Sequence, residues 1–135
     1  MTTLVTKYGL RVLLGLAGLC ALVVSARAQS REVFGYAGVL GEWEIIAAVA
    51  HIGAPVDNEF SGTLTMTHIG MCTQDGPEQK TGEIRLQLSA FAPELRAALV
   101  LAGVACTFTG TLSDAYKGLL SCADKPPMPL TLSVK

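Results

Sequence analysis

Side chains that could bind a soft metal gather in one short stretch of the sequence. Met66, His68, Met71 and Cys72 lie within seven residues, and thioether, imidazole and thiolate groups are ligands that copper sites use. The alternating polarity of this stretch places Met66 and His68 on the inner face of a strand, where a histidine is more often part of the core. His51 adds a second imidazole, but the sequence supplies no third ligand. We therefore expect no resident metal or cofactor, and the candidate ligands for a metal are His68 and Cys72.

The cysteines predict one disulfide. Of the four cysteines, Cys20 lies in an N-terminal segment with the features of an export signal, and the odd number that follows leaves one thiol unpaired. If residues 113–115 form a hairpin turn, Cys106 stands directly opposite Cys122. Opposed residues at a non-hydrogen-bonded site have Cα atoms about 4.5–5.5 Å apart, which suits a disulfide. We predict a Cys106–Cys122 bridge and a free thiol at Cys72.

The groups that common hydrolases use are not arranged for catalysis in this sequence. No serine stands in a Gly-x-Ser-x-Gly turn, and His51 is too remote in sequence to identify a base for Cys72. Glu42 and Glu44 share one strand face, but that face is the predicted solvent side, where carboxylates are usually only solvated. We expect a protein without catalytic activity. The alternative is a thiol- or metal-dependent redox module that uses Cys72 and His68.

The elements that must position these residues are mostly strands. Apolar and polar residues alternate over residues 60–68 and 82–88, and further strands are expected at 104–112, 116–122 and 130–134. Residues 41–49 also alternate, although their alanines would allow a helix.

One segment favours a helix. Pro93 and Glu94 suit a first turn, Leu95 and Leu99 are four residues apart, and Gly103 suits a helix end. A buried strand is the alternative for this segment. We therefore predict an all-β fold with minor α content: a small antiparallel β-barrel or sandwich with one short helix near residues 93–102.

The opening Gly41-x-Trp43, followed by an antiparallel meander, resembles lipocalin-like small barrels. Avidin-like proteins and the periplasmic inhibitors of secreted metalloproteases are among them. The resemblance covers residues 41–45 and the general rhythm of the strands. It implies a barrel that binds a ligand or a protein partner. In the inhibitor family the N-terminal residues insert into a protease cleft, a role that would fall here to residues 29–32.

The first 28 residues have the three parts of a cleavable signal peptide. Lys7 and Arg11 are basic, residues 12–24 form an uncharged run of 13 residues, and Ala26-Arg27-Ala28 predicts cleavage before Gln29. The uncharged run is shorter than the ~20 residues that span a bilayer. We expect a signal peptide over 1–28, a flexible lead-in over 29–40, a single β domain over 41–135, and a periplasmic or secreted protein in which disulfides persist.

The charge of the exported part limits its partners. Cleavage would remove three of the ten basic residues and none of the eleven acidic ones, leaving 107 residues with a net charge of −4. This balance argues against nucleic acid and against anionic membranes as partners. Binding residues on a rigid β scaffold usually lie in its loops, here residues 53–59, 71–81 and 124–129. We expect a non-catalytic binding protein for a ligand or a protein partner, whose identity the sequence does not specify.

Overall fold

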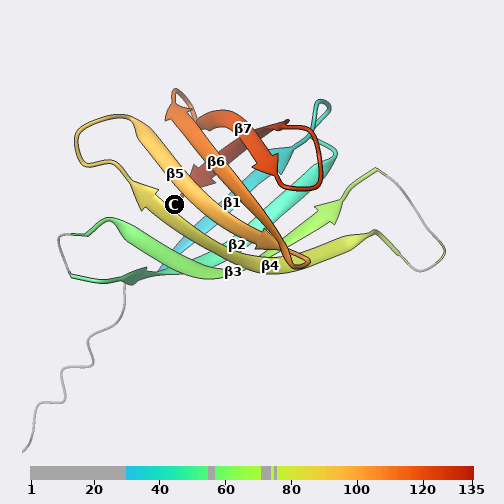
Figure 1. The fold of residues 1–135 in the computed structure, drawn as a ribbon, viewed down its shortest axis with the longest axis horizontal. Coiled ribbons are helices and arrows are strands. Elements are labelled where there is room, and N and C mark those ends of the chain that lie inside the picture. The colour runs from blue at the N-terminus through green and yellow to red at the C-terminus, as the bar shows by residue number, and fades with distance from the viewer. Residues whose placement is uncertain (1–29, 55–56, 71–73, 75) are drawn as a thin grey trace, which may run out of the picture.

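The computed structural model describes residues 30–54, 57–70, 74 and 76–135. In this part of the chain, eight antiparallel strands form a closed barrel, in which each strand pairs with the next and β1 pairs with β8 (Figure 1). The strands are β1 (Ser30–Ala37), β2 (Trp43–Ile52), β3 (Glu59–His68), β4 (Gln79–Leu88), β5 (Glu94–Leu101), β6 (Val104–Leu112), β7 (Tyr116–Cys122) and β8 (Met128–Val134). The described residues include no helix that is long and apolar enough to cross a membrane. The predicted signal peptide, residues 1–28, lies outside the described residues.

The core occupies the inside of the barrel because every strand buries alternate residues. Side chains on opposite faces of a strand follow a period of two, and the inward positions carry the apolar residues. The outward threonines at 63, 107, 109 and 111 are exposed. The largest fully buried side chains are Phe108, Ile45, Leu64, Ile84, Leu86, Leu95, Leu99, Leu120, Leu130, Leu132, Val33 and Val49. The sequence left a barrel and a sandwich open. The structure is a barrel, because every described strand pairs with a neighbouring strand on both sides.

The predicted helix near residues 93–102 is wrong. This segment is β5, whose side chains alternate between buried and exposed, and β5 pairs with β4 on one side and β6 on the other. Leu95 and Leu99 are four residues apart, a spacing that fits one face of a helix and also one face of a strand. Ala97 and Leu101 are buried as well. Burial at every second position is the pattern of a strand. The pairings with β4 and β6 supply hydrogen-bond partners for the backbone N–H and C=O groups of β5.

Most of the expected flexible lead-in is a strand. Residues 30–37 form β1, which closes the barrel by pairing with β2 and β8. Val33 and Ala37 are buried on its inner face, and Gly35 lies between them. A Cβ atom at Gly35 would collide with the backbone oxygen of Thr131. The inward Gly35 and the exposed Phe34 and Tyr36 on the outer face together interrupt the alternation of apolar and polar residues, which is why the pattern was not apparent in the sequence.

The predicted pairing of β6 with β7 is confirmed. Cys106 stands opposite Cys122, and Gly110 stands opposite Gly118. The Phe108 ring lies so close to both inward glycines that a Cβ atom on either would crowd it. The two glycines therefore make room for the largest fully buried side chain of the core.

Candidate binding site

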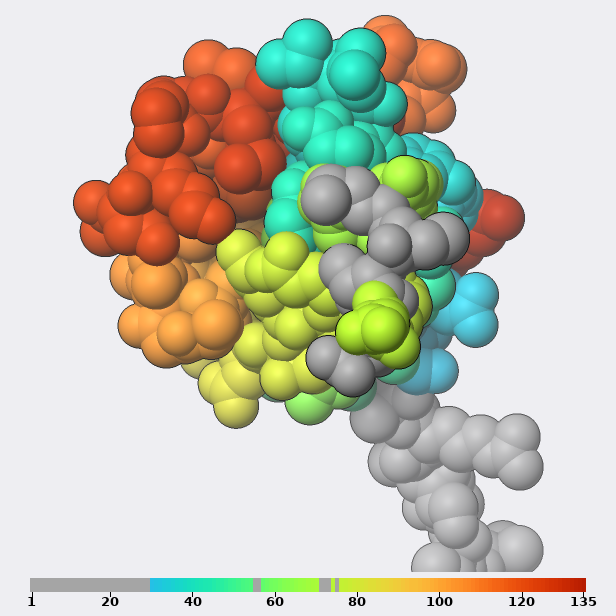
Figure 2. All heavy atoms as spheres, turned by 90° about the vertical axis from the view of Figure 1, so that its right-hand side faces the viewer, coloured from blue at the N-terminus to red at the C-terminus, as the bar shows by residue number. Residues whose placement is uncertain are grey.

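The connections between strands divide between the two ends of the barrel. Those following β1, β3, β5 and β7 meet at one end, which we call the Trp43 end, because Trp43 is the first residue of β2 there. Those following β2, β4 and β6 meet at the other, which we call the Phe60 end. Figure 2 faces the Trp43 end, which is ringed by the start of β2 in teal, of β4 in yellow-green, the β5–β6 turn in orange and the β7–β8 connection in red-orange. Of the predicted binding segments, residues 124–129 and the described residues of 71–81 belong to the Trp43 end, whereas the described residues of 53–59 belong to the Phe60 end; residues 55–56, 71–73 and 75 lie outside the described residues.

A cavity of about 280 Å³ lies at the Trp43 end, inside the mouth of the barrel. Its walls are mainly apolar, with Met66, Leu101, Val104 and Met128 beside Trp43. These side chains come from five different strands. Each of them points inward and belongs to the core or packs against it. A small cavity with apolar walls and a few polar groups is the usual form of a site for a small molecule.

Trp43, His68 and Lys80 form a cluster at the rim of this cavity, which we call the Trp43 cluster. The imidazole of His68 packs edge-on against the indole, with ring centroids 4.5 Å apart and an interplanar angle of 77°. The Nζ atom of Lys80 lies 5.0 Å from the centroid of the indole, within the range of a cation–π interaction. The indole is thus held from two sides while it borders the cavity.

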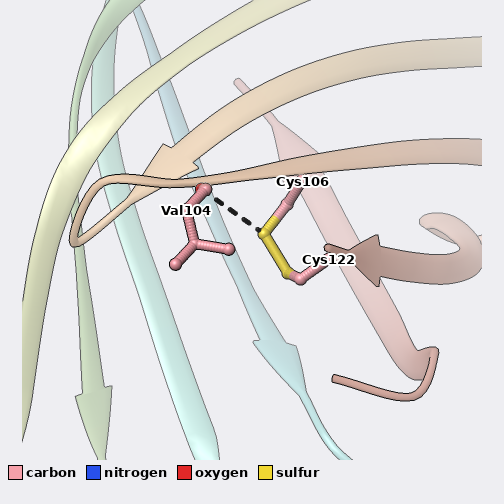
Figure 3. Close-up of a disulfide and its surroundings, with 3 residues drawn as sticks. All are labelled: Val104, Cys106 and Cys122. Atoms are coloured by element: carbon pink, nitrogen blue, oxygen red, sulfur yellow. Dashed lines mark hydrogen bonds between the residues drawn. A yellow bond between two sulfur atoms is a disulfide. The ribbon is translucent and has the colours of Figure 1, made fainter. Parts of the chain in front are cut away.

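The disulfide lines the same cavity. Cys106 and Cys122 have Cα atoms 4.1 Å apart and sulfur atoms joined at 2.00 Å, so the predicted pairing is present in the structure (Figure 3). The Cys106 sulfur contacts the carbonyl oxygen of Val104 at 3.8 Å; because a disulfide sulfur carries no hydrogen, this is a contact and not a donated hydrogen bond. Cys106 is buried and Cys122 is half-buried. The bridge therefore fixes β6 to β7 where they form the cavity wall.

Three charged side chains complete the cavity lining: Lys80, Asp124 and Lys125. Lys80 is half-buried and Lys125 is exposed. The pKa of Lys80 is lowered from its ordinary value by a close side-chain contact with Lys125, by burial and by the charge of Lys125. The charges of Glu78 and Asp124 act in the opposite direction but do not cancel the shift. The mouth therefore presents adjacent positive charges beside an apolar interior.

Lys80 lies within the predicted binding segment 71–81, but the sequence pattern assigned it to a loop and not to a strand. In the structure it lies on β4, two residues before the inward Gly82 and four before the buried Ile84. Its parity with Ile84 and Leu86 was visible in the sequence. Extending the alternation of residues 82–88 backwards by two residues would have placed this lysine on the inner face.

The two histidines lie at opposite ends of the barrel. His51 pairs with Phe60 and His68 pairs with Trp43. Phe60 and His68 are eight residues apart on one strand, which corresponds to about 26 Å at ~3.3 Å per residue. The imidazoles cannot share a metal ion at that separation. Among the described residues, no group of three His, Cys, Asp or Glu side chains could hold a metal. Cys72, the predicted free thiol and weak metal candidate, lies outside the described residues.

Glu42 has a local structural role. Its carboxylate accepts a hydrogen bond from the Leu40 N–H at 3.0 Å, inside the turn that joins β1 to β2. Gly38 has a φ of +97°, and a Cβ atom there would collide with the same carboxylate. Glu44 is half-buried on β2 and stands opposite Tyr36 and Thr67. The two glutamates therefore do not converge on a common site.

A second hollow, of about 400 Å³, lies at the Phe60 end around the β4–β5 connection. It is bordered by residues 87–91 and by the exposed ion pair between Arg96 and Glu94, whose atoms are 2.8 Å apart. Phe91 in this connection is fully exposed. Of the residues that border this hollow, only Leu88 packs against the core. We therefore assign the candidate site to the Trp43 end, where the cavity is continuous with the core.

Comparison with known protein families found no match, and no curated protein matched the chain. The eight-stranded antiparallel barrel is compatible with the lipocalin-like fold that the Gly41-x-Trp43 opening implies. This agreement concerns the architecture.

Proposed function

We propose that this protein is an exported binding protein without catalytic activity, which holds a small and largely apolar molecule in the cavity at the Trp43 end. The observation that carries the proposal is the cavity itself, about 280 Å³ in volume, with apolar walls and a rim of three charged side chains. Ligand sites in proteins combine these two features. The volume is just below the usual range of about 300–1,000 Å³, which favours a ligand of modest size.

The construction of the cavity wall supports a preformed site. Each described strand is paired with a neighbour on both sides. The Cys106–Cys122 bridge also links β6 to β7 at the cavity. Less conformational entropy is lost on binding when the walls are already ordered. A disulfide is also typical of periplasmic and extracellular proteins, which fits the proposed export of this chain.

The proposal can be tested with a neutral apolar dye, N-phenylnaphthylamine, added to the protein purified after export. Binding should raise the emission of the dye and change the emission of Trp43, which is the single tryptophan of the chain. Val104→Phe should fill the cavity and weaken dye binding at least about ten-fold, equivalent to about 1.4 kcal/mol.

Ala105→Phe is the matched control, because Ala105 is the next residue on β6 and is exposed on the outer face. This variant should bind the dye as the native protein does. Equal binding by Val104→Phe and Ala105→Phe, with both variants folded by circular dichroism, would place the site elsewhere. Absence of dye binding by the native protein would refute the proposal.

A further inference from the structure

The mouth of the cavity holds two lysine side chains close together. Lys80 projects from the inner face of β4 and lies over the indole of Trp43, while Lys125 lies in the connection between β7 and β8. Both line the cavity. The lowered pKa of Lys80, caused first by its contact with Lys125, is the effect expected when two ammonium groups repel one another in partly desolvated surroundings.

No carboxylate of the described residues forms an ion pair with either lysine. Within that part of the chain, the side-chain ion pairs closer than 4.0 Å are Arg96–Glu94 and Lys117–Asp114, both away from this cavity. Asp124 lines the cavity without contacting Lys80 or Lys125 at that distance. An anion between the two ammonium groups would relieve their repulsion and accept charge-assisted hydrogen bonds.

We propose that the ligand of this cavity is an amphipathic anion, whose apolar body lies against Trp43 and Met66 and whose single carboxylate lies between Lys80 and Lys125. This inference rests on the proposed function, because it assigns a chemical class to the ligand of the same site. The order of the groups follows from the cavity, which is apolar inside and carries two lysines against the one carboxylate of Asp124 at its mouth. A neutral molecule would use only the apolar walls, and a cation would be repelled.

The test is displacement of bound N-phenylnaphthylamine by three compounds with the same alkyl chain: octanoate, octanol and octylammonium. Octanoate should displace the dye with an affinity about five-fold higher than octanol, and octylammonium should be the weakest. The advantage is modest because both ammonium groups retain contact with water. It should shrink as salt is raised, since screening acts on exposed charges, whereas displacement by octanol should not weaken.

Two variants locate the effect. Lys80→Met and Lys125→Met keep a long apolar side chain while removing the charge, so each should reduce the ratio of octanoate affinity to octanol affinity toward one. Lys117→Met is the control, because Lys117 pairs with Asp114 at the Phe60 end. It should leave the preference for octanoate intact.

The outcomes separate this inference from the proposed function. If octanol displaces the dye as well as octanoate does, and the lysine variants change neither, the apolar site stands and the anionic ligand class is overturned. Stronger binding of octylammonium than of octanoate would also overturn it. If the native protein binds neither the dye nor any of the three compounds, both proposals fail.

Discussion

At each end of the barrel a cationic side chain and a histidine contact an aromatic ring, but of these two rings only Trp43 borders the inner cavity. At the Phe60 end, the Arg31 guanidinium lies 5.2 Å from the centroid of the Phe60 ring, and His51 packs edge-on against that ring at 5.4 Å. At the Trp43 end, Lys80 and His68 take the corresponding places around Trp43. Each end therefore has a cation over an aromatic ring and a histidine at its edge.

The difference lies in how deeply the ring is buried. Phe60 is only 2% exposed and belongs to the core, whereas Trp43 is half-buried and borders the cavity. His51 is also fixed at the Phe60 end by contact of its Nε2 with the carbonyl oxygen of Asp57. The same local motif thus serves packing at one end and borders the cavity at the other. Depth of burial, not residue type, distinguishes the two roles.

The largest expected effect comes from removing the ring at each end. Phe60→Ala should lower the free energy of unfolding by about 3–5 kcal/mol, because it deletes a fully buried ring. Trp43→Ala should cost about half as much, because the indole is half-buried and already borders empty space. Urea denaturation followed by circular dichroism measures both values. Equal losses from the two variants would show that the ends are equally well packed.

The next largest effect concerns the disulfide, which reinforces only the Trp43 end. Replacing Cys106 and Cys122 by serine opens a loop with a sequence separation of 16, which corresponds to about 3 kcal/mol in the chain-entropy model. For a domain of this size the melting temperature should fall by roughly 10–20 °C. Cys72→Ser is the control and should change it little. Peptide mapping that joined Cys72 to either partner would contradict the assigned bridge.

The smallest effect is expected at Arg31. Its Nε atom is buried without a hydrogen-bond partner, so the native state bears a desolvation cost that Arg31→Met would remove. We expect the free energy of unfolding to change by less than about 1 kcal/mol, in either direction, because the cation–π contact with Phe60 is lost at the same time. A loss above about 2 kcal/mol would indicate that the guanidinium has a strong partner.

Much of the fold could be predicted where polarity alternates without interruption. Residues 60–68 and 82–88 lie in β3 and β4, which pair as an antiparallel hairpin, and the position of one short turn was enough to predict that Cys106 faces Cys122. The errors came from ambiguous patterns. Gly35 broke the alternation of β1, and the spacing of Leu95 and Leu99 allowed a helix. In both segments, pairing with neighbouring strands decides the conformation.

The site was predictable only in part. The sequence placed Met66 and His68 on an inner face, as the structure does, and it suggested a metal site that also needed Cys72, a residue outside the described part. It could not bring Lys80 to Trp43, or Lys125 to Lys80, because these residues lie on elements that are far apart in sequence. The signal peptide and the absence of catalysis stay predictions.

By itself, the sequence determined which side chains face inward within most strands, because that depends on the period of two that covalent geometry imposes on any extended chain. Only the tertiary structure decided that the sheet closes, because closure depends on the tilt and stagger of all eight strands together. Closure in turn gathered Trp43, Lys80 and the disulfide around one cavity. These are long-range relationships, and no local pattern encodes them.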